Sequence, residues 1–159
     1  SMTGWRIGYI AAPIEIAKAV SSMQSHTTSN ACSIAQYAAV EALNSPESGE
    51  FVSEMQKVFD DRRKYMMKRI DGIPCLKYSE PAGAFYMFVD VSWLYGKRYK
   101  EQIIDGSLSF ADAVLKKGVA VVPGAAFGND DCIRLSYATS MEDIKEGIDR
   151  IAEFIREVK

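Results

Sequence analysis

The sequence predicts an α/β protein in which a short mixed or antiparallel sheet is covered by helices. The segment from residue 46 to about residue 70 carries apolar side chains at helical spacing, and residues 144–158 do the same. Between them, residues 84–91 are rich in aromatic and β-branched side chains, a composition typical of a strand. A long helix, short strands and a final amphipathic helix together predict a layered core of the α+β kind.

Residues 1–45 are expected to contribute one strand and two helices. The strand is predicted over residues 7–12 and the first helix over 14–23. A polar loop over 25–30 precedes an alanine-rich helix over 31–43, whose small side chains suit close packing. Because these helices have apolar faces and no sheet to cover them, we expect residues 1–45 to be the remnant of a larger domain.

Residues 46–159 are expected to form a domain with its own core. Ser45 and Pro46 are typical of the cap and first turn of the long helix, and Gly72 is predicted to end it as a left-handed residue. Besides 84–91, strands are predicted over 75–78, 119–122 and 132–138.

Two more helices complete this predicted domain. A capping box at residues 109–112 opens the first, which closes at Gly118, and Ser140 with Asp143 caps the last helix. Residues 95–106 are expected to form a polar connection, helical in part.

Composition excludes several function classes. The 19 basic and 21 acidic residues give a net charge of −2, which offers no basic surface for nucleic acid or a membrane. The single histidine, His26, and three widely spaced cysteines predict neither a metal site nor a disulfide framework. We therefore expect buried thiols and a cytoplasmic protein.

Three motifs carry the functional signal. They are Met2-Thr3-Gly4-Trp5-Arg6-Ile7-Gly8-Tyr9, Gly83-Ala84-Phe85-Tyr86 and Cys132-Ile133-Arg134-Leu135-Ser136-Tyr137-Ala138. In this order and spacing they resemble the fold-type-I aminotransferases of subgroup I, and aspartate aminotransferases most closely. The resemblance covers essentially the whole chain. It implies the C-terminal small domain of that fold, over 46–159, with a remnant of the large domain before it.

The resemblance implies pyridoxal 5'-phosphate as the cofactor, with Arg6 binding its phosphate. An arginine offers the forked donors that a phosphate needs, and nearby glycines let a ligand approach the backbone. The hydroxyls of Thr27 and Ser29 could reach the phosphate of a neighbouring subunit, which implies a homodimer. A surface ion pair for Arg6, and helix capping for Thr27 and Ser29, are the alternatives.

The resemblance also implies that Arg134 grips the α-carboxylate of an amino acid. An arginine inside an apolar strand is costly unless it is paired, and a carboxylate pairs with it through two hydrogen bonds. The alternative is a salt bridge to Asp130, Asp131 or Asp90.

Phe85 is a candidate for flanking the substrate. Phe127 has the same status, although both are also typical core residues.

The implied reaction is transamination between an amino acid and a 2-oxo acid such as 2-oxoglutarate. It needs a lysine that holds the cofactor as a Schiff base. In the family, that lysine lies further before the motif arginine than Ser1 lies before Arg6. We therefore expect that no residue of this chain is catalytic. We also expect the chain on its own to be inactive and to bind the cofactor weakly. A β-lyase, another aminotransferase, or a non-catalytic binding or assembly domain on the same scaffold are the alternatives.

Overall fold

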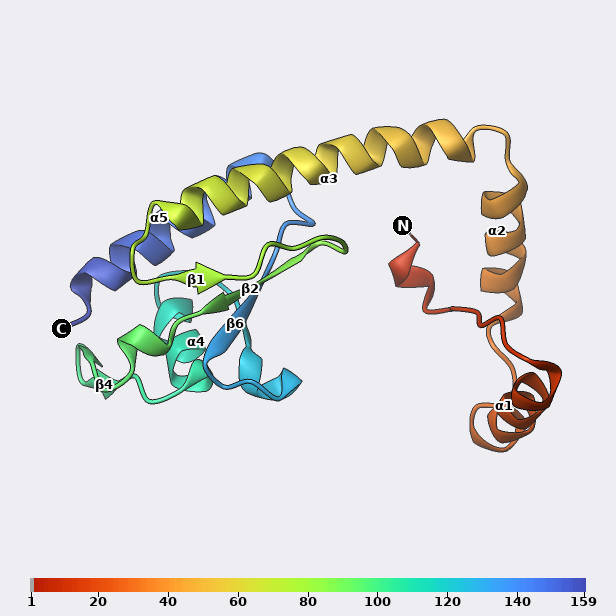
Figure 1. Ribbon diagram of the computed structural model, residues 1–159, viewed down its shortest axis with the longest axis horizontal. Helices are drawn as coiled ribbons and strands as arrows, with labels where there is room; N and C mark the ends of the chain where they lie inside the picture. Colours follow the sequence, from red (N-terminus) through yellow and green to blue (C-terminus); the bar gives the residue numbers. More distant parts are fainter. Residues whose placement is uncertain (1) are drawn as a thin grey trace. The chain divides into compact units, whose positions relative to one another are not determined.

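The computed structural model describes residues 2–159, and the chain divides into two compact units, Ser1–Met55 and Gln56–Lys159 (Figure 1). The division falls inside helix α3, Ser48–Asp71, whereas the sequence placed a domain boundary just before this helix. None of the helices in the described residues is both long and apolar enough to cross a membrane.

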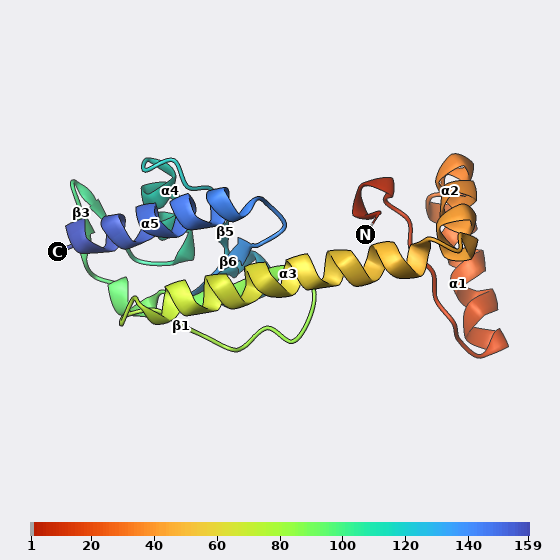
Figure 2. The ribbon, with the colours of Figure 1, turned by 90° about the horizontal axis from the view of Figure 1, so that it is seen from above.

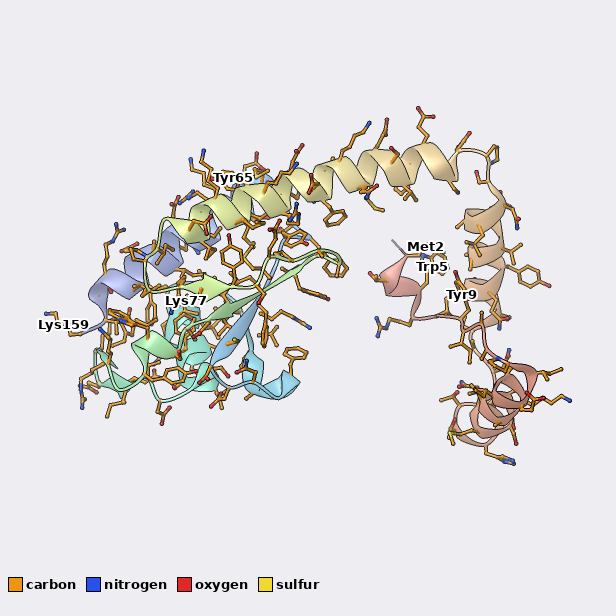
Figure 3. All side chains as sticks on the ribbon, in the orientation of Figure 1. Met2, Trp5, Tyr9, Tyr65, Lys77 and Lys159 are labelled. Atoms are coloured by element: carbon orange, nitrogen blue, oxygen red, sulfur yellow. The ribbon has the colours of Figure 1, made fainter. Side chains whose placement is uncertain are left out.

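The first unit contains a short 3-10 turn, Thr3–Trp5, and two helices, α1 (Ile14–Thr27) and α2 (Ser33–Asn44). The strand predicted over residues 7–12 does not form, because this segment has no strand to pair with. Trp5 in the turn and Tyr9 in the segment after it are 48% and 87% exposed (Figure 3).

Helix α1 runs four residues beyond its predicted end at residue 23. The hydroxyls of Ser25 and Thr27 donate to backbone carbonyls of the preceding turn, and so they extend the helix instead of forming a polar loop. The helix ends where the backbone N–H of Ser29, a residue with a φ of 64°, donates to the carbonyl of Gln24 at 2.9 Å.

The second unit is built on a four-stranded antiparallel sheet, which confirms the predicted short sheet. Its order is β1-β2-β6-β5. The strands are β1 (Lys77–Tyr78), β2 (Tyr86–Asp90), β6 (Cys132–Ser136) and β5 (Val122–Pro123). The 3-10 turn η2 (Ser92–Leu94) follows β2. The predicted connection over residues 95–106 forms no helix, and instead makes a small hairpin, β3 (Arg98–Tyr99) with β4 (Gln102–Ile103).

Three helices form the core with this sheet. They are the second half of α3, α4 (Ser107–Leu115) and α5 (Met141–Glu157). Helix α5 runs beside the second half of α3, and an ion pair between Arg69 and Asp149 joins them (Figure 2). The predicted apolar face of α5 is confirmed, since Ile144, Ile148 and Ile151 are at most 3% exposed.

Side-chain alternation gives the two central strands a buried face and a half-buried face. Met87 and Val89 on β2, with Ile133 on β6, enter the core and are at most 1% exposed. Register pairs Phe88 with Arg134, so both belong to the opposite face. The candidate site lies on that opposite face.

Two predicted helix ends differ in detail from the structure. Helix α4 starts at Ser107, and the hydroxyl of Ser109 accepts backbone N–H groups of Asp105 and Gly106 from inside its first turn. Helix α3 ends before Gly72 as expected, but Gly72 does not adopt the left-handed conformation. By contrast, the Ser140 hydroxyl accepts the N–H of Asp143 at 3.0 Å, which confirms the predicted cap of α5.

Candidate functional site

Arg134 lies between two aromatic rings on the half-buried face of the sheet. Its guanidinium carbon is 4.2 Å from the centre of the Tyr86 ring and 4.5 Å from that of Phe127. Tyr86 is held by the β2 ladder, and Phe127 comes from the turn η3 (Gly124–Phe127). The cation therefore has an aromatic contact from each of two elements, an arrangement that stabilises it without neutralising its charge.

The acidic residues proposed as alternative partners do not pair with Arg134. Among residues 2–159, no carboxylate oxygen lies within 4.0 Å of a guanidinium nitrogen of Arg134. Asp90 accepts the N–H and hydroxyl of Ser92, and Asp130 accepts those of Ser107. The half-buried guanidinium therefore forms no ion pair with these carboxylates.

Backbone geometry places Phe127 against Arg134. Gly124 opens the turn η3 where there is no room for a side chain, since a Cβ there would lie 2.2 Å from the carbonyl oxygen of Cys132. Gly128 closes the turn with a φ of 81°. Phe127 also meets Phe88 edge to face, with ring centres 6.2 Å apart.

Phe85, the predicted substrate-flanking aromatic, packs against other aromatic residues. Its ring centre is 4.4 Å from that of Tyr86 and 6.2 Å from that of Phe59. It borders the core and supports Tyr86, which in turn contacts Arg134. A role for Phe85 next to a substrate stays a prediction.

Tyr86 is the contact of Arg134 that sequence reasoning missed. The sequence places Tyr86 and Arg134 on two strands far apart in the chain, and only the pairing register brings Tyr86 opposite Ser136, two residues beyond Arg134. The signal available in the sequence was the alternation of β2, which puts Tyr86 and Phe88 on one face.

Arg6, in the first unit, follows the Thr3–Trp5 turn in a left-handed conformation with a φ of 55°. Its guanidinium is exposed and donates to the carbonyl of Thr3 at 3.2 Å. In the described part of the chain it has no acidic partner, so the surface ion pair that was the alternative role is not formed. An exposed cation beside Gly4 is compatible with a phosphate.

Thr27 and Ser29 lie at the end of α1 and are both exposed. The Thr27 hydroxyl donates to the carbonyl of Met23 at 3.2 Å, a contact within the helix. Ser29, with its positive φ, forms the left-handed residue after the helix. The Thr27 hydroxyl thus makes a contact within the helix rather than a cap, and Ser29 ends the helix through its backbone.

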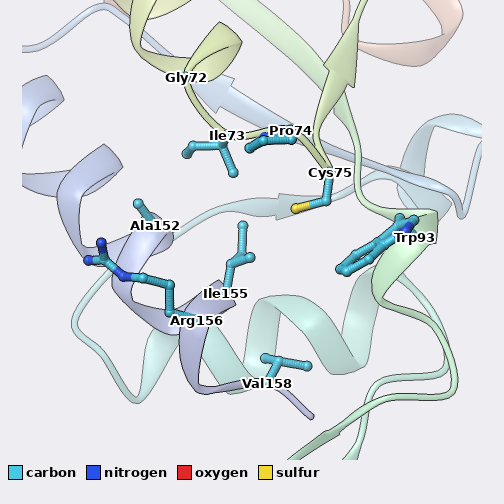
Figure 4. A pocket seen from close by; sticks show the side chains of 9 residues that line it. All are labelled: Gly72, Ile73, Pro74, Cys75, Trp93, Ala152, Ile155, Arg156 and Val158. Atoms are coloured by element: carbon cyan, nitrogen blue, oxygen red, sulfur yellow. The ribbon is translucent and has the colours of Figure 1, made fainter.

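A separate hollow of about 530 Å³ lies on the second unit (Figure 4). Cys75 and Trp93 line one side of it, and Ile155 and Arg156 of α5 line another. Burial raises the pKa of the Cys75 thiol, and the same cause raises the pKa of the Cys132 thiol, which favours the protonated form of both. Cys32, in contrast to the expectation of buried thiols, is exposed.

The fold defines a mixed α/β protein, and its site holds an arginine between two aromatic rings with no acidic partner among the described residues. The chain belongs to the family of class I and II aminotransferases, whose model matches residues 1–151. Members of this family depend on pyridoxal phosphate. The resemblance found in the three motifs is thereby confirmed.

Curated relatives are similar along the whole chain. A probable aspartate/prephenate aminotransferase of Aquifex aeolicus is 45% identical over 159 residues, which are 99% of this chain and 39% of that protein. An aspartate aminotransferase of a Bacillus species is 43% identical and is covered to 38%. The chain therefore spans about two fifths of the length of these relatives.

Solved structures agree with the sequence comparison. The aspartate aminotransferase of Rhizobium meliloti superposes with a TM-score of 0.85 at 39% identity, covering 99% of this chain and 40% of that one. The Thermus thermophilus aspartate aminotransferase with maleate gives a TM-score of 0.82 at 37% identity, covering 96% of this chain and 38% of that one. The two units thus form a mixed helix-and-sheet portion of the aspartate aminotransferase fold.

Proposed function

We propose that this chain supplies the small domain, with part of the large domain, of an aspartate-type aminotransferase. The observation that carries the proposal is Arg134, a half-buried guanidinium with aromatic contacts and no acidic partner among the described residues. A guanidinium without an acidic partner has the charge and donor geometry to bind a carboxylate through two hydrogen bonds. Its role is to hold the α-carboxylate of the amino acid.

Arg6 is proposed to bind the cofactor's phosphate. Its exposed guanidinium, without an acidic partner in residues 2–159, and the side-chain-free backbone at Gly4 fit such an anion. Pyridoxal phosphate, when bound, supplies an electron sink for moving a proton from the α-carbon of an amino acid. Thr27 and Ser29 are proposed as hydroxyl donors to the phosphate of a second copy, in which case the Thr27 hydroxyl must leave its contact with the carbonyl of Met23.

The names of the similar proteins guide the proposed substrates. Relatives are described as aspartate aminotransferases or as aspartate/prephenate aminotransferases. We therefore propose an acidic amino acid as donor and a 2-oxo acid as acceptor for the whole protein. Arg134 serves the carboxylate that every α-amino acid carries, so it contributes affinity without selecting the donor side chain.

The proposal for Arg134 is tested by Arg134→Lys in the full polypeptide that carries this chain. Lysine keeps the charge but loses the forked pair of hydrogen bonds. We expect kcat/KM for aspartate to fall roughly 10- to 100-fold, mainly through a higher KM, because a charged hydrogen bond is lost. Arg156→Lys, at an exposed position on α5, is the matched control and should leave kcat/KM unchanged. Equal kinetics for the Arg134 variant and the control would refute the role.

Catalysis also needs a lysine, which we propose lies outside residues 1–159. The 159-residue chain mixed with pyridoxal phosphate, aspartate and 2-oxoglutarate should then form no glutamate above a protein-free control. Measurable turnover by the chain would contradict this proposal.

The first unit is proposed to mediate association between copies. Its helices expose large apolar side chains, among them Met23, Ile34, Tyr37 and Leu43, each between 71% and 80% exposed. Exposed apolar surface of this extent is typical of an interface. Sedimentation velocity over a range of concentrations tests this. A mass that grows with concentration is expected, and a monomer at every concentration would exclude it.

A further inference from the structure

The turn η3, which carries Phe127, is tied to helix α4 by one buried serine. Ser107 has an exposed fraction of 0%. Its hydroxyl donates to Oδ1 of Asp130 at 2.6 Å and accepts the backbone N–H of Ala125, inside the turn, at 3.1 Å. One hydroxyl therefore connects the start of α4, the turn η3 and the loop before β6.

Asp130, the partner of Ser107, is itself held from several sides. The backbone N–H of Ser107 donates to Oδ1 of Asp130 at 3.0 Å, and the hydroxyl of Tyr95 donates to the Asp130 carbonyl. Burial and neighbouring carboxylates raise the pKa of Tyr95 to about 12, so this hydroxyl remains a donor at physiological pH. Gly106 leaves the space that the carboxylate occupies, since a Cβ there would lie 2.7 Å from Oδ2 of Asp130.

The two rings that contact Arg134 differ in how they are fixed. Tyr86 belongs to a strand whose ladder holds its backbone. Phe127 is 50% exposed and lies outside the ladder, two residues after Ala125 in the turn. The position of its ring therefore depends on what holds the turn.

We infer that Ser107 and Asp130 are positioning residues for Arg134, which act by fixing η3 so that Phe127 stays against the guanidinium. The inference deepens the proposed function and rests on it, since Arg134 is the group that would bind the substrate carboxylate. Rings packed against a guanidinium restrict its rotation and leave its N–H edges free for a carboxylate. The hydrogen-bonded chain from Asp130 through Ser107 to Ala125 thus prepares the arginine for its ligand.

The direct test uses the Nε–Hε resonance of Arg134 in the nitrogen-15 NMR spectrum of the 159-residue chain. Phe127→Ala sets the scale, because it removes the ring and the part of the resonance shift that the ring causes. Ser107→Ala should lose at least half of that same shift. Ser109→Ala is the matched control on the same helix, since its hydroxyl contacts Gly106 and Asp105 and does not reach the turn.

A second pair of variants keeps the test decisive if Ser107→Ala unfolds the chain. Asp130→Asn retains an oxygen that accepts from Ser107, and it should keep the Arg134 resonance near its wild-type position. Asp130→Ala removes the acceptor and should shift the resonance as Ser107→Ala does. An Arg134 resonance that moves in Phe127→Ala but in neither Ser107→Ala nor Asp130→Ala would overturn the inference.

Kinetics in the full polypeptide separate this inference from the proposed function. If both hold, Arg134→Lys and Ser107→Ala each raise KM for aspartate more than they lower kcat, and Ser109→Ala changes neither. An unchanged KM in Arg134→Lys defeats the proposed function. A raised KM in Arg134→Lys with an unchanged KM in Ser107→Ala defeats only the positioning role.

Discussion

At the scale of single residues, we expect substitution by alanine to change the free energy of unfolding in opposite directions at Gly124 and Gly147. At Gly124 a Cβ would lie 2.2 Å and 2.3 Å from backbone oxygens of Cys132 and Asn129, which cannot move cheaply. At Gly147, within α5, nothing lies within 4 Å. We expect Gly124→Ala to lower the free energy of unfolding by about 1–3 kcal/mol or more, and Gly147→Ala to raise it by about 0.5–1 kcal/mol.

Urea unfolding followed by circular dichroism measures both glycine variants against the wild-type chain. The pair forms its own control, since each variant adds one methyl group. A Gly124→Ala chain as stable as wild type would show that the turn η3 adapts and that the tight fit of Gly124 does not fix the position of Phe127.

The sequence could predict the role of a single residue where its neighbours along the chain were sufficient evidence. Arg134 stood out because a cation within an apolar strand needs a partner, and the structure shows it without an acidic one in the described chain. The rings of Tyr86 and Phe127 as its neighbours depend on the β2–β6 register and on the turn η3. Register and turn geometry are long-range properties, which side-chain patterns along one segment do not contain.

At the scale of elements, the cap of α5 offers a matched prediction. The Ser140 hydroxyl accepts the N–H of Asp143 at the helix start. Ser140→Ala should lower the free energy of unfolding by about 1 kcal/mol in urea. Ser53→Ala, at an exposed position inside α3, should have no such cost, because alanine favours a helix interior. Equal losses in both variants would mean that the cap contributes nothing.

Acid should weaken the same helix start. Hydrogen bonds from the hydroxyls of Thr139 and Ser140 lower the pKa of Asp143 below its ordinary value of 3.8. The stabilisation is therefore fully present above pH 3.8 and is lost as the pH falls through the lower folded-state pKa. The urea midpoint of wild type should thus fall more steeply below pH 3.8 than that of Asp143→Asn. Parallel curves for the two chains would contradict this.

Element prediction succeeded where a segment could be judged by itself. Amphipathic α5 and the long α3 were predicted from periodicity, and their ends agree with the structure within a few residues. The strand predicted over residues 7–12 was wrong, because an extended segment needs a partner that this unit does not provide in the described residues. Hydroxyls of Ser25 and Thr27 were predicted to favour a loop, yet their contacts with the preceding turn continue α1.

At the scale of the whole molecule, the buried core is confined to one unit. Every member of the buried hydrophobic cluster belongs to the second unit, from Met66 to Phe154. In the described part of the first unit, Ala35 is the one buried hydrophobic side chain, and α1 has none. Since burial supplies most of the stabilisation of a fold, the two units differ in what holds their helices in place.

Hydrogen exchange should reveal this difference in stability within the chain. At low protein concentration, amides of β2, β6 and α5 are expected to exchange slowly, near the rate set by global unfolding, because the core surrounds them. Amides of α1 should exchange much faster, since that helix buries no side chain. Raising the concentration should slow exchange in α1 and α2 alone if copies associate through their exposed apolar faces. Protection of α1 equal to that of β6 at every concentration would show that the first unit is stable without a partner.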